Sequence, residues 1–128
     1  SMPTSAESNV VVVVNKNAPV EKMSRSEVID LFMGKFVAFP NGTKAQPVEL
    51  KFETETKQVF YRQLVGMSMS RVNAYWARLK FTGKLRSALP KSSESEIIQS
   101  IESSDIAIGY IPRSKLTSQL KVVYELNE

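Results

Sequence analysis

The pattern of apolar and polar positions along the chain predicts four strands. Five consecutive valines at 10–14 form an uninterrupted apolar run, which is typical of a strand buried on both faces, as in a parallel sheet. Residues 47–52 alternate between apolar and polar side chains, which predicts a strand with one wetter face. Residues 106–111 predict a buried strand that Pro112 breaks, and residues 120–126 predict the last strand.

Between the predicted strands, apolar side chains recur at the three- and four-residue spacing of amphipathic helices, and four helices are expected. Their inner faces carry Val28, Leu31 and Phe32 in the first; Val59, Phe60 and Leu64 in the second; Val72, Tyr75, Trp76 and Leu79 in the third; Ile97, Ile98 and Ile101 in the fourth. The third helix has the most regular stripe. Residues 84–92 are basic and contain a proline, so we expect them to form a loop.

Polar residues and glycines mark where these helices begin and end. Ser24 with Glu27, and Ser93 with Glu96, have the spacing of a capping box, in which the cap and the third helical residue satisfy each other's backbone N–H groups. Thr54 is the expected N-cap of the second helix. Either of two serines opens the third helix, and glycines close the first three: Ser68, Ser70, Gly34, Gly66 and Gly83.

The resulting order of strand, helix, strand, three helices and two strands predicts an α/β fold. We expect a small, mostly parallel or mixed sheet flanked by helices, within a single domain over residues 10–128. Ser1 and Met2 are interpreted as the remnant of a tag. Residues 3–9 are small and polar, so residues 1–9 as a whole are expected to be a tag scar and a disordered N-terminus.

The composition removes several classes of chemistry. The 128 residues include no cysteine and no histidine, which excludes disulfides, thiolate or imidazole metal ligands, and catalysis by cysteine or by a serine–histidine pair. Acid–base catalysis by Asp or Glu without a metal remains open, but no paired-carboxylate pattern supports it. We therefore expect no catalytic residue, no metal site and no cofactor, in a protein that is not an enzyme. The longest apolar run, Val10–Val14, is too short for membrane insertion.

The net charge of +4 suits an anionic partner such as phosphate, a nucleic acid or a membrane surface. The basic residues are scattered without a run of five, and no nucleic-acid-binding motif accompanies them. Nucleic-acid binding is therefore not expected, and a solubilising excess of charge explains the same composition.

Three stretches of sequence, in this order, resemble a known family. Residues 10–35 carry a valine-rich strand, an Asn-Ala-Pro-Val stretch and a helix that ends in Leu-Phe-Met-Gly-Lys. Residues 60–66 end a helix with Phe-Tyr-Arg-Gln-Leu-Val-Gly, and residues 106–112 read Ile-Ala-Ile-Gly-Tyr-Ile-Pro. Together they are similar to the second lobe of the phosphate-binding proteins of ABC transporters, and the similarity covers nearly the whole chain.

This resemblance implies the fold of one lobe of a type II periplasmic binding protein and a non-enzymatic, solute-binding role for an ABC transporter. It also implies a periplasmic location, with a secretory signal already removed. The expected partners are phosphate or another small anion, the membrane component of the transporter, or a second copy of the chain. The alternative is a protein–protein interaction module that kept the lobe fold without phosphate binding.

The family holds phosphate at a Gly-Ser-Gly-Thr-Arg turn, where backbone N–H groups and a helix dipole attract an oxyanion. The resemblance places residues 53–57 on this turn, with Thr54, Thr56 and Lys57 as the expected anion ligands and glutamates in place of both glycines. Those glutamates repel an anion, so the alternative is that Thr54 only caps the helix. Asn15 follows the first strand, at the position where open α/β sheets bind ligands, and is the fourth candidate ligand. The alternative is that Asn15 belongs to a simple turn after the strand.

Two further groups of residues each leave two interpretations open. Tyr75 and Trp76, with Arg78, could stack on a base or a sugar, or could pack in the core at their helical spacing. The basic residues of the predicted loop could contact an acidic partner or belong to an ordinary surface loop: Lys84, Arg86 and Lys91.

Overall fold

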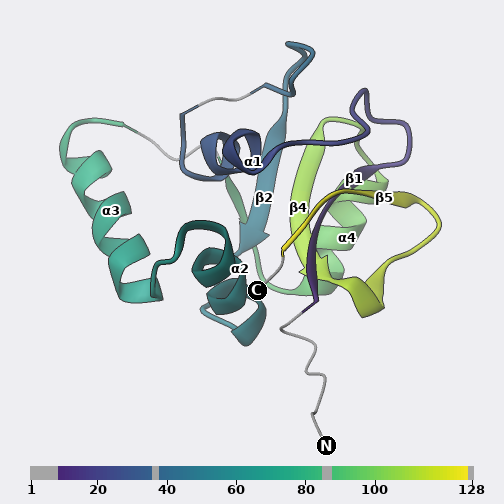
Figure 1. The fold of residues 1–128 in the computed structure, drawn as a ribbon. Coiled ribbons are helices and arrows are strands. Elements are labelled where there is room, and N and C mark those ends of the chain that lie inside the picture. The colour runs from purple at the N-terminus through teal and green to yellow at the C-terminus, as the bar shows by residue number, and fades with distance from the viewer. Residues whose placement is uncertain (1–8, 36–37, 85–87, 127–128) are drawn as a thin grey trace, which may run out of the picture.

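A computed structural model describes residues 9–35, 38–84 and 88–126 of the chain. In this part of the chain, five strands form one mixed sheet in the order β3-β2-β4-β1-β5 (Figure 1). The strands are β1 (Val10–Asn15), β2 (Gln46–Leu50), β3 (Leu89–Lys91), β4 (Ala107–Pro112) and β5 (Leu120–Glu125). The helices are α1 (Arg25–Phe32), α2 (Glu55–Val65), α3 (Met69–Phe81) and α4 (Glu94–Glu102). The expected α/β class with helices flanking a mixed sheet is confirmed.

The tag remnant and disordered segment expected at residues 1–9 fall outside the described residues, except for Asn9. The single domain over residues 10–128 stays a prediction. None of the helices described is both long enough and apolar enough to cross a membrane.

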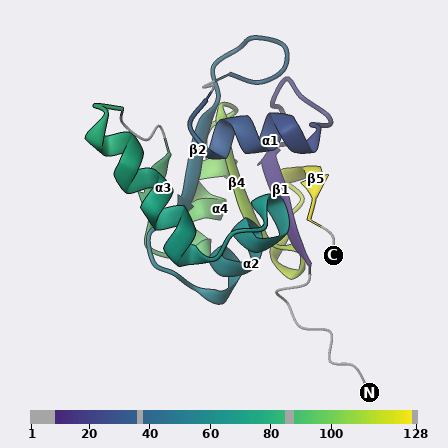
Figure 2. The same ribbon diagram turned by 60° about the vertical axis from the view of Figure 1, so that its left-hand side comes forward.

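Helices cover both faces of the sheet. On one face, the rings of Phe32 in α1 and Phe60 in α2 lie 5.9 and 3.9 Å from the ring of Tyr110 in β4, between centroids. On the other face, α4 approaches β4 so closely that a Cβ added to Gly109 would lie 3.0 Å from Cγ2 of Ile97. Figure 2 shows α1 and α2 on one side of the sheet, α4 on the other, and α3 beyond α2 at the margin of the molecule.

Strand β1 is antiparallel to both of its neighbours, β4 and β5, so the expectation of a parallel strand is wrong. Its burial on both faces is confirmed, since Val10–Val14 are all at most 1% exposed. An unbroken run of valines reports burial and not direction, and β1 is a central strand that contacts α2 on one face and α4 on the other. Pro112, expected to break β4, is its last residue and lies opposite Val10.

Strand β2 lacks the wetter face that its alternating sequence predicts. Glu49 is only 2% exposed, and its carboxylate accepts a 2.6 Å hydrogen bond from the hydroxyl of Tyr61 in α2. The exposed part of the alternating segment, Lys51 and Phe52, lies after the strand has ended. The polar position in the strand is therefore an ionisable group enclosed in the core, because α2 supplies it with a hydrogen-bond donor.

The loop expected at residues 84–92 contains a strand, β3, which pairs parallel to β2 with Leu89 opposite Val48. This strand is three residues long and lies at the edge of the sheet. An edge position tolerates Pro90, whose missing N–H group can face away from the neighbouring strand. A segment this short has no measurable period of apolar residues, which is why the sequence pattern does not reveal it.

The helix boundaries follow the predicted caps closely. Ser24 and Glu27 form the expected capping box in both directions. Ser93 caps α4, but the carboxylate of Glu96 accepts from the backbone N–H of Ser92 instead of that of Ser93. The second capping box is therefore formed only in one direction.

Candidate anion-binding crevice

Three parallel strands end at one edge of the sheet, and we call this edge the crevice. Strand β2 is parallel to β3 and to β4, so the carboxyl ends of all three lie at the same edge. The chain leaves β2 into α2 on one face of the sheet and leaves β3 into α4 on the other face (Figure 1). Such a change of face between neighbouring parallel strands is where open α/β sheets bind ligands.

The beginning of α2 places three of the predicted ligands at this edge. Thr54 is the N-cap, and its hydroxyl accepts a 3.3 Å hydrogen bond from the backbone N–H of Lys57. The Nζ of Lys57 turns inward and donates a 2.8 Å hydrogen bond to the carbonyl of Leu50, the last residue of β2. Burial lowers the pKa of Lys57, and the carboxylate of Glu53 opposes this effect. Thr54 and Lys57 therefore stabilise the junction between strand and helix.

Thr56 lies at the crevice, where its side chain already binds a carboxylate of this protein. Its hydroxyl donates a 2.6 Å hydrogen bond to a carboxylate oxygen of Glu94, the first residue of α4. The other oxygen of Glu94 lies 3.0 Å from the ammonium of Lys115. Lys115 belongs to η2 (Arg113–Lys115), the short 3-10 helix that follows β4. Segments that follow β2, β3 and β4 thus meet at one carboxylate.

The glutamate that replaces the first glycine of the family turn has a structural partner. Asn73 of α3 donates a 2.6 Å hydrogen bond to the carboxylate of Glu53, and the side chain of Gln58 donates to the backbone carbonyl of Glu53. The carboxylate of Glu53 is therefore held beside the beginning of α2, where it repels an incoming anion.

Asn15, the fourth predicted ligand, lies at the opposite edge of the sheet. Strand β1 runs antiparallel to β4, so its carboxyl end lies beside the beginning of β4. The side-chain amide of Asn15 donates to the carbonyls of Ile101 and Glu102, at 2.9 and 3.1 Å, and its oxygen accepts from the N–H of Asn17. Asn15 therefore caps the end of α4 and lies at the edge of the sheet opposite Thr54, Thr56 and Lys57.

Tyr75 and Trp76 of α3 pack against residues at the end of α1. The hydroxyl of Tyr75 donates to the carbonyl of Met33, and the ring of Trp76 lies against Gly34. Both side chains are only partly buried, and Arg78 beside them is exposed. This arrangement favours packing over stacking on a ligand.

The loop residues that were expected to contact an acidic partner are separated in the structure. Lys84 is exposed after α3, Lys91 is the last residue of β3, and Arg86 lies outside the described residues.

Sequence reasoning missed Glu94 and Lys115, the two charged groups at the centre of the crevice. The signal that locates them is topological, because both follow the carboxyl end of a strand parallel to β2. Glu94 could not be placed while β3 was taken for a loop. In the described ranges 9–35, 38–84 and 88–126, no three carboxylates gather closely enough to hold a metal ion.

Comparison of the whole fold with solved structures identifies the class of protein that it resembles. An ABC-type phosphate transport receptor from Vibrio cholerae is 16% identical, with a TM-score of 0.70 over 90% of this chain and 45% of that one. A candidate phosphate ABC transporter substrate-binding protein with bound phosphate, from Clostridium perfringens, is 16% identical, with a TM-score of 0.71 over 90% of this chain and 44% of that one. A candidate phosphate-binding protein from Planctomyces limnophilus is 20% identical, with a TM-score of 0.65 over 90% and 40%.

The fold is therefore that of one lobe of the phosphate-binding-protein-like periplasmic binding proteins. The particular likeness is to the phosphate receptors just named, of which this chain spans less than half the length. No family model and no curated protein matches the sequence.

Proposed function

We propose that this chain is a non-enzymatic, solute-binding lobe that holds a small inorganic oxyanion such as phosphate weakly in the crevice. One observation carries the proposal: the hydroxyl of Thr56 and the ammonium of Lys115 already hold the carboxylate of Glu94 there. The phosphate-binding names of the structural neighbours support the choice of phosphate. By the same likeness, we propose that it serves an ABC transporter in the periplasm.

Glu94 sets the affinity in this proposal, because an incoming anion has to displace its carboxylate. A hydrogen bond to a charged group contributes about 1.5–3 kcal/mol, which corresponds to a loss of about ten- to a hundredfold in affinity for the competing anion. The carboxylate of Glu53 weakens binding further by repulsion. We therefore expect wild-type affinity for phosphate in the millimolar range.

Isothermal titration calorimetry of phosphate against Glu94→Gln tests this proposal. The substitution removes the competing charge, so affinity for phosphate rises at least tenfold over the wild type. Asp105→Asn is the matched control, because Asp105 is exposed and lies before β4, at the opposite edge of the sheet. Micromolar binding by the wild type would contradict the role of Glu94, and an absence of heat from both proteins would remove the anion site.

A second candidate function is an interaction module that kept the lobe fold and binds no phosphate. The observation that favours it is that the carboxylate of Glu94 already occupies the hydroxyl of Thr56 and the ammonium of Lys115, while that of Glu53 lies beside the start of α2. Phosphate calorimetry separates the two candidates: no heat from the wild type or from Glu94→Gln, with both proteins folded, favours the module.

A further inference from the structure

Charge is distributed very unevenly along this chain. Residues 56–93 contain eight basic residues and no acidic residue, a net charge of +8. The rest of the chain contains the other nine basic residues and all thirteen acidic residues, a net charge of −4. One stretch of the sequence is therefore complementary in charge to the remainder.

The basic stretch presents an exposed aromatic ring at the end of α3. Phe81 is 92% exposed, and with Ala77 and Lys80 it lines a shallow apolar hollow on the surface. Arg78 and Lys84 are exposed within one helical turn of Phe81. No carboxylate of the described residues forms an ion pair with Arg78, Lys80 or Lys84. We call Arg78, Lys80, Phe81 and Lys84 the basic knob.

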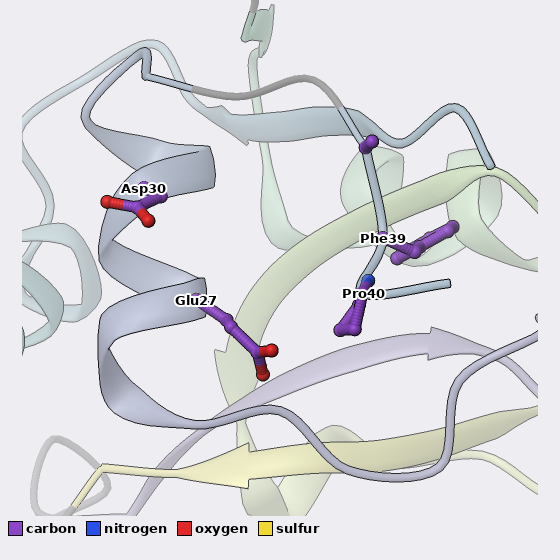
Figure 3. Close-up of a pocket in the computed structure, with 5 residues that line it drawn as sticks. Glu27, Asp30, Phe39 and Pro40 are labelled. Carbon is purple, nitrogen blue, oxygen red and sulfur yellow. The ribbon is translucent and has the colours of Figure 1, made fainter. Parts of the chain in front are cut away.

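A pocket of opposite charge lies between α1 and residues 38–40. Its volume is about 250 Å³, and it is lined by Glu27, Asp30, Ala38, Phe39 and Pro40. Figure 3 shows the side chain of Glu27 reaching from α1 toward Pro40, with Asp30 one turn further along the helix. A cavity of about 150 Å³ holds a benzene molecule, so this acidic pocket is large enough for a phenyl ring.

We propose that the basic knob of one copy of this chain docks into the acidic pocket of a second copy. Phe81 then enters a space with apolar walls, and Lys80 and its basic neighbours face Glu27 and Asp30. A symmetric contact between two α3 helices is disfavoured, since it would bring like charges together. Because knob and pocket are different surfaces, the contact is heterologous and can repeat from copy to copy. The inference does not depend on the proposed anion site.

Sedimentation velocity and light scattering at protein concentrations from about 20 µM to about 1 mM test this contact. This range suits a weak interface, which buries less than about 1,200 Å² of surface. At low ionic strength the apparent mass should rise with concentration, and high salt should reduce the rise. Phe81→Ser should raise the dissociation constant about tenfold or more, because it removes a buried ring. Phe52→Ser, which alters another exposed ring, should have no effect.

Charge reversal identifies the two surfaces. Lys80→Glu and Asp30→Lys should each abolish self-association, because each brings like charges together at the contact. A one-to-one mixture of these two variants should associate again, because the reversed knob then meets the reversed pocket. Lys16→Glu, an exposed lysine outside both surfaces, is the control for net charge and should behave as the wild type.

A wild type that stays monomeric at the highest concentration in low salt overturns the proposal. So does association that persists in Phe81→Ser, or a mixture of the two charge variants that remains monomeric. A monomeric wild type that instead sediments with phosphatidylglycerol vesicles would assign the basic knob to an anionic lipid surface, and this too overturns the proposal.

Discussion

Replacing Tyr61 with phenylalanine removes a single hydroxyl from the core and tests how the buried carboxylate of Glu49 is stabilised. That hydroxyl donates a 2.6 Å hydrogen bond to Glu49, which is 2% exposed in the middle of the sheet. Burial, with a smaller effect from Tyr110, raises the pKa of Tyr61 well above its ordinary value, so the hydroxyl keeps its proton across the neutral range. The aromatic ring and its packing on Phe60 are unchanged by the substitution.

The expected loss follows from the burial of the acceptor. A hydrogen bond between neutral groups contributes about 0.5–1.5 kcal/mol, whereas loss of the donor to a buried acceptor costs about 1–3 kcal/mol. Tyr75→Phe is the matched control, because the hydroxyl of Tyr75 donates to a neutral acceptor, the carbonyl of Met33, at a partly buried site. In a domain of this size, Tyr61→Phe should lower Tm by about 5–15 °C, and Tyr75→Phe by clearly less.

Urea unfolding at neutral pH, followed by circular dichroism, measures both variants on one scale. The free energy of unfolding should fall further in Tyr61→Phe than in Tyr75→Phe, with similar m-values in both. A double-mutant cycle with Glu49→Gln should return a coupling energy of about 1 kcal/mol or more. Equal stability of Tyr61→Phe and the wild type would refute the reasoning that Glu49 depends on this donor.

Three further substitutions have expected outcomes. Gly109→Ala should lower the free energy of unfolding by about 1–3 kcal/mol in urea titrations, because its Cβ would lie 3.0 Å from Ile97; unchanged stability would contradict this close packing. Burial lowers the pKa of Lys57 below its ordinary value of 10.5 in the folded protein. Between that lowered pKa and about 10.5 the unfolded chain binds more protons than the folded one, so the free energy of unfolding rises with pH. Unfolding measured from about pH 7 to 11 should show this rise in the wild type and not in Lys57→Met. Asn15→Ala should cost about 1–3 kcal/mol in thermal unfolding through its lost bonds to the end of α4, and should leave phosphate calorimetry unchanged; a changed affinity would return Asn15 to the site.

Much of the fold could be predicted because local chemistry determines it. The N-caps Ser24 and Thr54 depend on hydrogen bonds within four residues, and the sequence alone shows them; for α3 the structure selects Ser68 from the two candidate serines. The direction of β1 could not be predicted, because its neighbours β4 and β5 lie about a hundred residues away and a valine run reports only burial. Strand β3 could not be predicted, because a strand of three residues is too short to show a repeating pattern of apolar positions.

In the candidate site, too, residues that are close in sequence could be predicted, and residues that strand pairing brings together could not. Thr54, Thr56 and Lys57 lie within four residues at the start of α2, so their closeness follows directly from the sequence. Glu94 and Lys115 join them only through the parallel pairing of β2 with β3 and β4, which no local pattern reveals. The position of Asn15 at the opposite edge could not be predicted, because a residue that follows a strand can lie at either edge of the sheet.

The central position of β1 has a consequence for the order of folding during synthesis. Both strands that pair with its five valines, β4 and β5, are made about a hundred residues after them. At about 5–20 residues per second, a nascent chain carries this apolar strand unpaired for about 5–20 seconds. A short β-branched segment without charge is the kind that associates with other chains when it is left exposed. The same valine run that joins β4 to β5 in the sheet is thus a segment that can associate with other chains until β4 and β5 have been made.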